Sequence, residues 1–167
     1  MSILKEDGLP IIFKQLRTGH NQKEFTFLKI RTMKNNTPSV TTNNANPLDY
    51  LNSGKTIRKY KIDEMPQLFN VVKGDINLIG FRPGLSTDLD LIKAREDNGV
   101  FSFMPGITGL AQVTGHKMDD AVTLSKVDKL YYEKKSMVLD LKILICTFSG
   151  LFRSDLQKLI KDSIQNV

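Results

Sequence analysis

Hydrophobic and polar positions divide the first third of the chain into an alternating stretch and a polar loop. Residues 9–16 are mainly apolar, residues 18–21 read Thr-Gly-His-Asn, and residues 25–33 alternate with the period of a strand. This pattern predicts a β-hairpin over residues 9–33. The strand face with Phe25 and Phe27 also carries Lys29 and Arg31. Residues 34–54, rich in Asn, Thr, Ser and Pro without apolar periodicity, predict a loop.

After a basic stretch that begins at residue 55, a helix is predicted over residues 63–74. Its apolar positions follow the spacing of one helix face: Met65, Leu68, Phe69 and Val72. Asp63 is a favoured N-cap residue, Pro66 fits a first turn, and Gly74 fits the C′ position. We therefore expect Asp63 and the adjacent Glu64 at the positive end of a helix dipole, which favours two ionised carboxylates near pH 7.

Downstream of this helix, short strands alternate with helices. Residues 76–79 predict a strand, residues 105–110 a tightly turning backbone, and residues 111–115 a short strand and turn. A helix is predicted over residues 85–97, with one side formed by Leu85, Leu89, Ile92 and Glu96. Another is predicted from Asp119 to about Lys134, with an apolar face of Leu124, Val127 and Tyr131.

Residues 137–152 are mostly apolar with few charges, and two interpretations stay open. The stretch is either a core helix or a helix in a membrane interface, with Lys142 and Arg153 at its polar boundary. Residues 155–167 predict a polar, frayed tail. The elements together predict an α+β fold in a single domain of residues 1–167. In it, the N-terminal hairpin, short strands and amphipathic helices pack around the N-terminus of the helix at Asp63.

The composition is that of a folded soluble domain with an anionic partner. The 167 residues are 40% hydrophobic and 25% charged, and the net charge of +6 indicates nucleic acid, an anionic lipid surface or a phosphorylated substrate. No nucleic-acid-binding motif is present, so we expect no nucleic acid partner. No apolar run approaches the ~20 residues of a membrane span, and the N-terminus lacks a signal peptide. We therefore expect a protein that is neither transmembrane nor secreted.

The histidines and the cysteine point to no metal or redox chemistry. His20 and His116 stand apart and give no zinc-binding spacing. The single Cys146 forms no intrachain disulfide and fits a reducing compartment. It lies in an apolar run, which predicts a buried, inert thiol.

The candidate chemistry is carried by adjacent carboxylates among cations. Asp63 and Glu64 fit helix capping, but Arg58 precedes them and Arg82 follows, as a site for a metal-bound phosphate would require. Lys29 and Arg31 fit either that site or a solvated edge strand protected against aggregation. Both interpretations stay open at each position.

Several segments, in order and spacing, resemble the bacterial sugar transferase family, the small monotopic phosphoglycosyl transferases. They cover roughly residues 9–150 of the chain. The segments are Phe13-Lys-Gln15, Lys29-Ile-Arg-Thr-Met33, Asp63-Glu-Met-Pro-Gln-Leu-Phe-Asn-Val-Val-Lys-Gly-Asp75, Gly80-Phe-Arg-Pro83, Pro105-Gly-Ile-Thr-Gly-Leu-Ala-Gln-Val113 and Leu139-Asp-Leu-Lys-Ile143.

The resemblance implies a magnesium-dependent transfer of a phosphosugar from a UDP-sugar to polyprenyl (undecaprenyl) phosphate. This is the first membrane step in the assembly of a glycan, such as a capsule, O-antigen, exopolysaccharide or glycoprotein glycan. It implies that Asp63 is the nucleophile that forms a covalent phosphosugar intermediate, with Glu64 beside it, and that this pair holds Mg²⁺. The phosphate-binding residues that it implies are Lys29, Arg31, Arg58 and Arg82. It also implies peripheral attachment to the cytoplasmic face of the bacterial inner membrane.

The chain departs from the family pattern at several places. The family has an N-terminal hydrophobic hairpin, which we expect to be absent here, either in a truncated, soluble cytoplasmic form or in a variant that docks by its other helices. Phe81 replaces the usual first proline of Gly-Pro-Arg-Pro, and Thr114-Gly115-His116 replaces the usual Asn-Gly-Arg. An alternative function is therefore a non-catalytic relative that acts as an interaction or regulatory module. No motif identifies the sugar or the oligomeric state.

Overall fold

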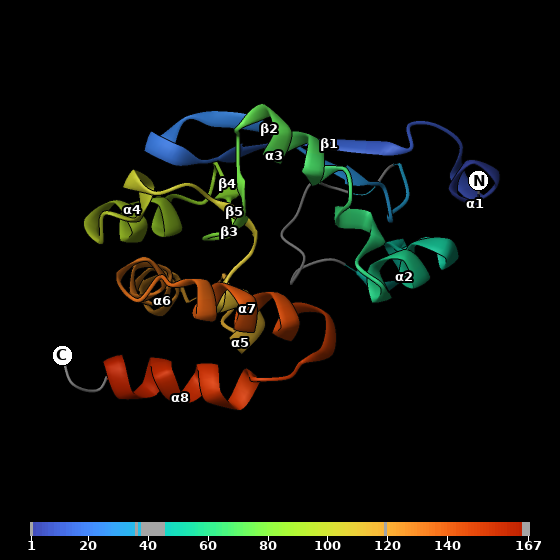
Figure 1. Cartoon of the computed structure of the whole chain (residues 1–167). Helices are drawn as coiled ribbons and strands as arrows, with labels where there is room; N and C mark the ends of the chain where they lie inside the picture. Colours follow the sequence, from blue (N-terminus) through green and yellow to red (C-terminus); the bar gives the residue numbers. More distant parts are fainter. Residues whose placement is uncertain (1, 36, 38–45, 119, 165–167) are drawn as a thin grey trace. The chain divides into compact units, whose positions relative to one another are not determined.

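The computed structural model describes residues 2–35, 37, 46–118 and 120–164 (Figure 1). They form two compact units that alternate along the chain: Met1–Gln15 with Thr26–Asn70, and Leu16–Phe25 with Val71–Val167. The elements are helices and short strands, which confirms the predicted α+β class. The single domain of residues 1–167 stays a prediction.

The predicted hairpin is present near the N-terminus. Helix α1 (Ser2–Asp7) precedes strand β1 (Ile12–Thr18), and the 3-10 helix η1 (His20–Gln22) connects β1 to strand β2 (Glu24–Ile30). Strands β1 and β2 are neighbours in one sheet. The second strand ends at Ile30, so the predicted extent to residue 33 was too long.

Helical elements occupy part of the predicted loop at residues 34–54, which corrects that expectation. They are the 3-10 helix η3 (Pro47–Asp49) and helix α2 (Asn52–Lys59). Helix α2 is polar and lacks the apolar periodicity from which a helix is recognised. A Cβ atom on Gly54 would lie 2.2 Å from the carbonyl oxygen of Thr32, so only glycine allows this packing. Residues 36 and 38–45 of the predicted loop lie outside the described residues.

The helical segment of residues 61–73 begins differently from the prediction. A 3-10 helix, η4 (Ile62–Glu64), leads into helix α3 (Gln67–Lys73), and Gly74 follows with a φ of 79°, as predicted for the C′ position. Asp63 lies inside η4, and Lys61, with a φ of 55°, takes the N-cap position instead. The assignment of Asp63 as an N-cap was therefore wrong.

The faces of this segment are reversed relative to the hydrophobic pattern. The predicted core face is exposed, and it consists of Met65, Leu68, Phe69 and Val72. Within residues 61–73, all of which are described, only polar residues are buried. They are Asp63, Gln67 and Asn70, with 6, 0 and 1% of their surface exposed. Buried polar groups require partners, so the buried polar face, and not the exposed apolar one, carries the candidate chemistry of this segment.

The second unit contains two short strand pairs. Strands β3 (Asn77–Ile79) and β5 (Gly106–Thr108) are parallel, and strand β4 (Gly84–Leu85) pairs antiparallel with the end of β1 at Arg17 and Thr18. The strand predicted at residues 76–79 is confirmed. A Cβ atom on Gly106 would lie 2.1 Å from the backbone nitrogen of Gly80, which explains the glycine at this close crossing.

Helices supply most of the second unit (Figure 1). They are α4 (Leu89–Asp97), the 3-10 helix η5 (Val100–Ser102), α5 (Leu110–Thr114), α6 (Ala121–Glu133), α7 (Met137–Ser149) and α8 (Arg153–Ile164). Most of their buried apolar residues form one core, which includes Leu91, Leu110, Val127, Ile143 and Ile160. Val100 and Phe101 of η5 form a second cluster with Phe81. Among the described residues, no helix has both the length and the apolar character needed to cross a bilayer.

Several helix predictions need correction. Residues 111–115 belong to α5 and are not a strand. Helix α4 starts at Leu89, which is exposed, and its buried residues are Leu91 and Arg95, whereas Ile92 of the predicted side is only partly buried. The expected polar tail is largely helix α8, which buries Leu156 and Ile160. A helix five residues long gives no periodicity, and α4 and α8 each hide few apolar residues among charges, so the pattern alone could not identify these faces.

Other predictions about the second unit are confirmed. The face of α6 formed by Leu124, Val127 and Tyr131 is buried, as is the thiol of Cys146. Asp120 caps α6 by accepting a hydrogen bond from the backbone nitrogen of Thr123. The predicted cap, Asp119, lies outside the described residues.

A buried ion pair joins α4 to α6. Arg95 donates from Nε and Nη2 to Oδ2 of Asp128 at 3.1 and 2.8 Å, and both residues are buried. The guanidinium also lies 4.7 Å from the ring centre of Phe81. Burial raises the pKa of Asp128, and Arg95 opposes this rise. The ring centre of Phe81 also lies 5.9 Å from that of Phe101, so aromatic and cation–π packing hold Phe81 in place.

Candidate active site

Asp63 is a buried carboxylate in the first unit. It lies in η4, where the unusual backbone of Lys61 starts the turn. Burial raises the pKa of Asp63, an effect opposed by the positive charge of Lys29, increased by the negative charge of Glu64 and opposed again by Arg58. A helix dipole alone would lower the pKa of Asp63, so the observed direction is the opposite of the one predicted. The sequence pattern did not show that this residue is buried, and burial is the largest effect.

Glu64 and Lys29 form the polar boundary of this site. Lys29 Nζ lies 3.4 Å from Glu64 Oε1, and both side chains are partly exposed. Lys29 comes from β2 and Glu64 from η4, so the fold joins two segments separated by more than thirty residues of sequence. The structure therefore brings Lys29 to the carboxylate pair, where it can also attract an anion.

Arg58 approaches the same site from the last turn of α2. Its charge acts on the Asp63 carboxylate, and its guanidinium lies 5.0 Å from the ring centre of Tyr50. Stacking on an aromatic ring orients a guanidinium without using its donors. Arg58 is thus a cation close enough to Asp63 to affect its ionisation.

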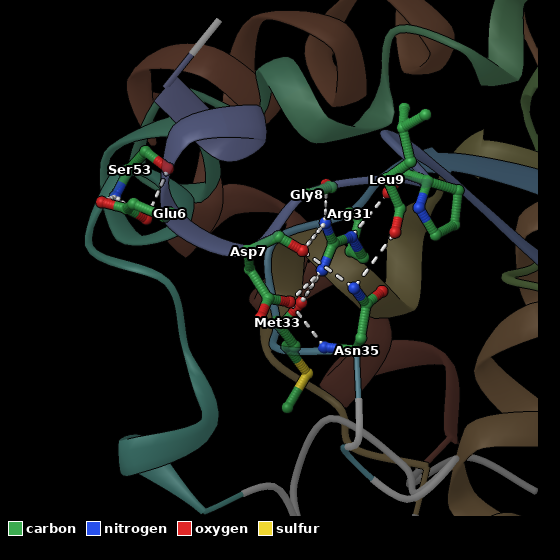
Figure 2. A network of polar contacts seen from close by, with 9 residues as sticks. Glu6, Asp7, Gly8, Leu9, Arg31, Met33, Asn35 and Ser53 are labelled. Atoms are coloured by element: carbon green, nitrogen blue, oxygen red, sulfur yellow. Dashed lines mark hydrogen bonds and ion pairs between the residues drawn. The ribbon is translucent and has the colours of Figure 1, made fainter.

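Arg31 has a different environment. It is buried, and Figure 2 shows its guanidinium surrounded by the turn after α1 and by Met33. It pairs with the carboxylate of Asp7 and donates to the carbonyl oxygens of Asp7, Gly8, Pro10 and Met33. Asn35 donates to Asp7 as well, which holds the pKa of Asp7 below its usual value. In this structure Arg31 fixes the N-terminal turn, and its role in phosphate binding stays a prediction.

Arg82 belongs to the second unit, where Arg17 lies near it. Arg17 donates from Nη1 to the carbonyl oxygen of Pro83 at 3.2 Å. Burial, and then the charge of Arg82, lower the pKa of Arg17 to about 10. The sequence analysis did not identify Arg17, because a lone arginine in a hairpin carries no local signal. Arg17 and Arg82 place two positive charges near this turn, and the negative charge of Asp88 opposes their effect on each other.

A small cavity of about 20 Å³ lies beside Arg82 in the second unit. Gly80, Gly109, Gln112 and His116 are among the residues that line it. His116 Nδ1 lies 2.9 Å from Thr114 Oγ1, so the histidine of the Thr114-Gly115-His116 segment is held in place. The same histidine also lines an open depression of about 350 Å³ with Gln157 and Lys161.

The first unit offers oxygen ligands that fit a magnesium ion. Asp63 and Glu64 supply carboxylates from adjacent residues, and the buried Gln67 of the same helical segment carries an amide oxygen without a hydrogen-bond partner among the described residues, which is also a hard donor. In the part of the chain that the structure describes, no three His, Cys, Asp or Glu side chains gather as a metal site. Magnesium commonly needs only one or two carboxylates, because substrate phosphate and water complete its coordination.

Comparison with known proteins gives a consistent result. The family model for the bacterial sugar transferases matches residues 1–154. The chain is 39% identical over 148 residues to the "Uncharacterized sugar transferase EpsL" of Bacillus subtilis. These aligned residues cover 89% of this chain and 73% of that protein.

Other relatives carry more specific names. The chain is 34% identical over 164 residues to the "UDP-glucose:undecaprenyl-phosphate glucose-1-phosphate transferase" of Caulobacter vibrioides, covering 93% of this chain and 61% of that protein. It is 37% identical over 141 residues to the "UDP-N-acetylgalactosamine-undecaprenyl-phosphate N-acetylgalactosaminephosphotransferase" of Aeromonas hydrophila, covering 81% of this chain but 33% of that protein. The chain thus spans between one third and three quarters of these relatives.

Proposed function

The chain belongs to the bacterial sugar transferase family, and from this premise we propose that it transfers a sugar phosphate from a UDP-sugar to polyprenyl (undecaprenyl) phosphate. The observation that carries the proposal is the cluster in the first unit. It consists of a buried aspartate beside a glutamate, with two cations acting on it. Two relatives with these substrates in their names support the choice of donor and acceptor.

The proposed reaction has two displacements at one phosphorus atom. A carboxylate oxygen of Asp63 attacks the phosphorus attached to the sugar, the bond between the two phosphates breaks, and its electron pair leaves with UMP. A phosphate oxygen of the polyprenyl acceptor then attacks the same phosphorus and releases the Asp63 carboxylate. No proton is consumed overall, and one small site serves a soluble and a lipid substrate in turn.

The residues near Asp63 reduce the charge repulsion between a carboxylate and a diphosphate. Lys29 and Arg58 supply positive charge within the first unit, and we assign them to phosphate binding. We propose the same role for Arg82 of the second unit on the basis of the family resemblance alone. Bound magnesium would add charge neutralisation between the carboxylates and the phosphate oxygens. The burial of Asp63 strengthens each of these interactions, because less water screens them.

Release of UMP is the test of the proposed function. We expect the protein to release UMP from at least one member of a panel of UDP-sugars when polyprenyl phosphate and Mg²⁺ are present. Failure to release UMP from any member of the panel would favour a non-catalytic interaction module instead. The panel also identifies the sugar, which no residue of the site specifies.

Removal of the divalent cation should abolish this activity. EDTA should reduce UMP release to background, and excess Mg²⁺ should restore it, because the carboxylates and the diphosphate repel each other without a bridging cation. UMP is measured at fixed UDP-sugar concentration, with a buffer of equal ionic strength as the control. Full activity in EDTA would remove the metal from the proposed mechanism.

We further propose that the protein binds the cytoplasmic face of the bacterial inner membrane peripherally. Helix α7 buries Leu139, Ile143 and Cys146 and exposes an opposite apolar face. The exposed apolar residues of α7 and the following turn are Met137, Val138, Leu141, Phe148, Leu151 and Phe152. Helix α3 also exposes its apolar face. The two earlier interpretations of residues 137–152 are therefore compatible, since one face of α7 is core and the other is available to lipid.

Charge on the exposed face of α7 should weaken membrane binding. We expect the wild type to sediment with anionic liposomes at low salt and to dissociate partly at high salt, because basic residues contribute screened attraction. The double variant Leu141→Glu/Phe148→Glu should stay in the supernatant. The matched control, Leu89→Glu, changes an exposed leucine on α4 and should sediment like the wild type. Equal sedimentation of all three proteins would contradict the assignment of this face.

A further inference from the structure

The amide of Gln67 is buried without a protein partner. Its residue is 0% exposed, and neither Oε1 nor Nε2 has a hydrogen-bond partner among the described residues. Most buried polar side-chain atoms in proteins are hydrogen-bonded, so each exception requires an explanation. A side-chain amide both donates and accepts, and here both functions are unused.

Asn70, one turn further along α3, shows how the fold satisfies an amide with a structural role. Its Nδ2 donates to the carbonyl oxygen of Thr26 at 2.8 Å, and its Oδ1 accepts from the backbone nitrogen of Leu28 at 3.3 Å. Both polar atoms of Asn70 are thus paired with strand β2. The same helix therefore carries two buried amides of which only one is held by the protein.

The position of Gln67 relates it to the proposed reaction centre. Glu64 before it is tied to β2 through Lys29 at 3.4 Å, and Asn70 after it is tied to the same strand. Between these ties, Gln67 lies on the inward side of the helical segment, one turn after Asp63. The buried residues of the segment thus run from the proposed nucleophile through an unpaired amide to a structural one.

We infer that Gln67 is a substrate-binding residue whose amide contacts the magnesium-bound diphosphate of the nucleotide sugar. The inference rests on the proposed function. An amide oxygen is a suitable neighbour for Mg²⁺ or a water on it, and an amide NH₂ donates to a phosphate oxygen. One ligand therefore satisfies both atoms of Gln67. A neutral amide also supplies a donor without adding a further negative charge to the segment that carries Asp63 and Glu64.

The variant Gln67→Met tests the inference, because methionine has a similar length but no amide. The probe is UDP, which carries the diphosphate but no sugar to transfer, with Mg²⁺ or with EDTA. We expect Gln67→Met to bind Mg²⁺·UDP at least about tenfold more weakly than the wild type, as for a lost hydrogen bond to a charged group. Its melting temperature without ligand should equal or exceed that of the wild type, because no protein hydrogen bond is lost.

The matched control is Asn70→Met on the same face of the same segment. It loses two hydrogen bonds to β2, so we expect a lower melting temperature without ligand. Its affinity for Mg²⁺·UDP should stay within about twofold of the wild type, the change expected where no ligand contact is lost. The two variants should thus show opposite patterns in stability and in binding.

Each outcome decides between the possibilities. A loss of affinity for Mg²⁺·UDP supports the inference. If the wild type also binds UDP in EDTA, a loss there as well assigns the contact to the phosphate, and unchanged affinity there assigns it to the metal and its water. Equal affinity in Gln67→Met and wild type overturns it and leaves the proposed function intact. A Gln67→Met protein that melts far below wild type or does not fold also overturns it, since the amide is then structural. A wild type that neither binds Mg²⁺·UDP nor releases UMP contradicts both proposals.

Discussion

Asp63→Asn should lower transferase turnover by on the order of ten-thousand-fold or more, as expected when a nucleophile without substitute is lost. Asparagine keeps the size of the side chain but removes the attacking anion. The folding free energy should be unchanged or slightly more favourable. Burial raises the pKa of Asp63, so ionisation of this carboxylate costs more free energy in the folded protein than in the unfolded chain. A neutral asparagine removes this cost.

The measurement is UMP release together with urea denaturation near pH 7. The control is Asp97→Asn, which changes an exposed aspartate at the end of α4 and should leave both quantities near their wild-type values. Near-normal turnover of Asp63→Asn would show that the carboxylate is not the nucleophile. A large loss of stability would show that the inactivity is a consequence of misfolding.

Asp128→Asn should destabilise the protein by about 3–5 kcal/mol, the effect expected when one partner of a buried ion pair is removed. Arg95 would remain buried with its charge uncompensated, since its Nε and Nη2 both donate to the lost carboxylate. The free energy of unfolding is measured by chemical denaturation near pH 7. The double variant Arg95→Met/Asp128→Leu should be less destabilised than Asp128→Asn, because it leaves no unpaired charge.

The control for this effect is Lys126→Gln, an exposed position of the same helix α6, which should change stability by less than about 0.5 kcal/mol. A double variant at least as unstable as Asp128→Asn would indicate that packing around Phe81, rather than charge, determines the result.

The hydrophobic pattern located most elements but misjudged the orientation of the most important one. Met65, Leu68, Phe69 and Val72 have the spacing of a core face, and periodicity alone cannot distinguish a core from a surface exposed to lipid or solvent. The structure shows that this face is outward and that Asp63 and Gln67 are buried. The burial that raises the pKa of Asp63 could therefore not be predicted from the sequence.

The ordered motifs predicted the family correctly. The structure explains why the environments of individual residues could not be predicted from local sequence alone. Lys29 reaches Glu64 only because β2 packs along η4 and α3, a long-range contact with no local signal. Arg31 shares the strand motif with Lys29 but is held by Asp7 and four carbonyl oxygens of the first unit. The sequence analysis did not identify Arg17 as a candidate residue, because its interest depends on its proximity to Arg82, which only the structure shows.

The most direct test of the central claim is the mass of the intact protein after incubation with UDP-sugar and Mg²⁺ in the absence of lipid acceptor. A donor that gives UMP release with acceptor is used. We expect a covalent phosphosugar adduct that maps to Asp63, is absent in Asp63→Asn and disappears when polyprenyl phosphate is added. UMP release with acceptor but no adduct without it, or an adduct on another residue, would contradict the assignment of Asp63 as the nucleophile.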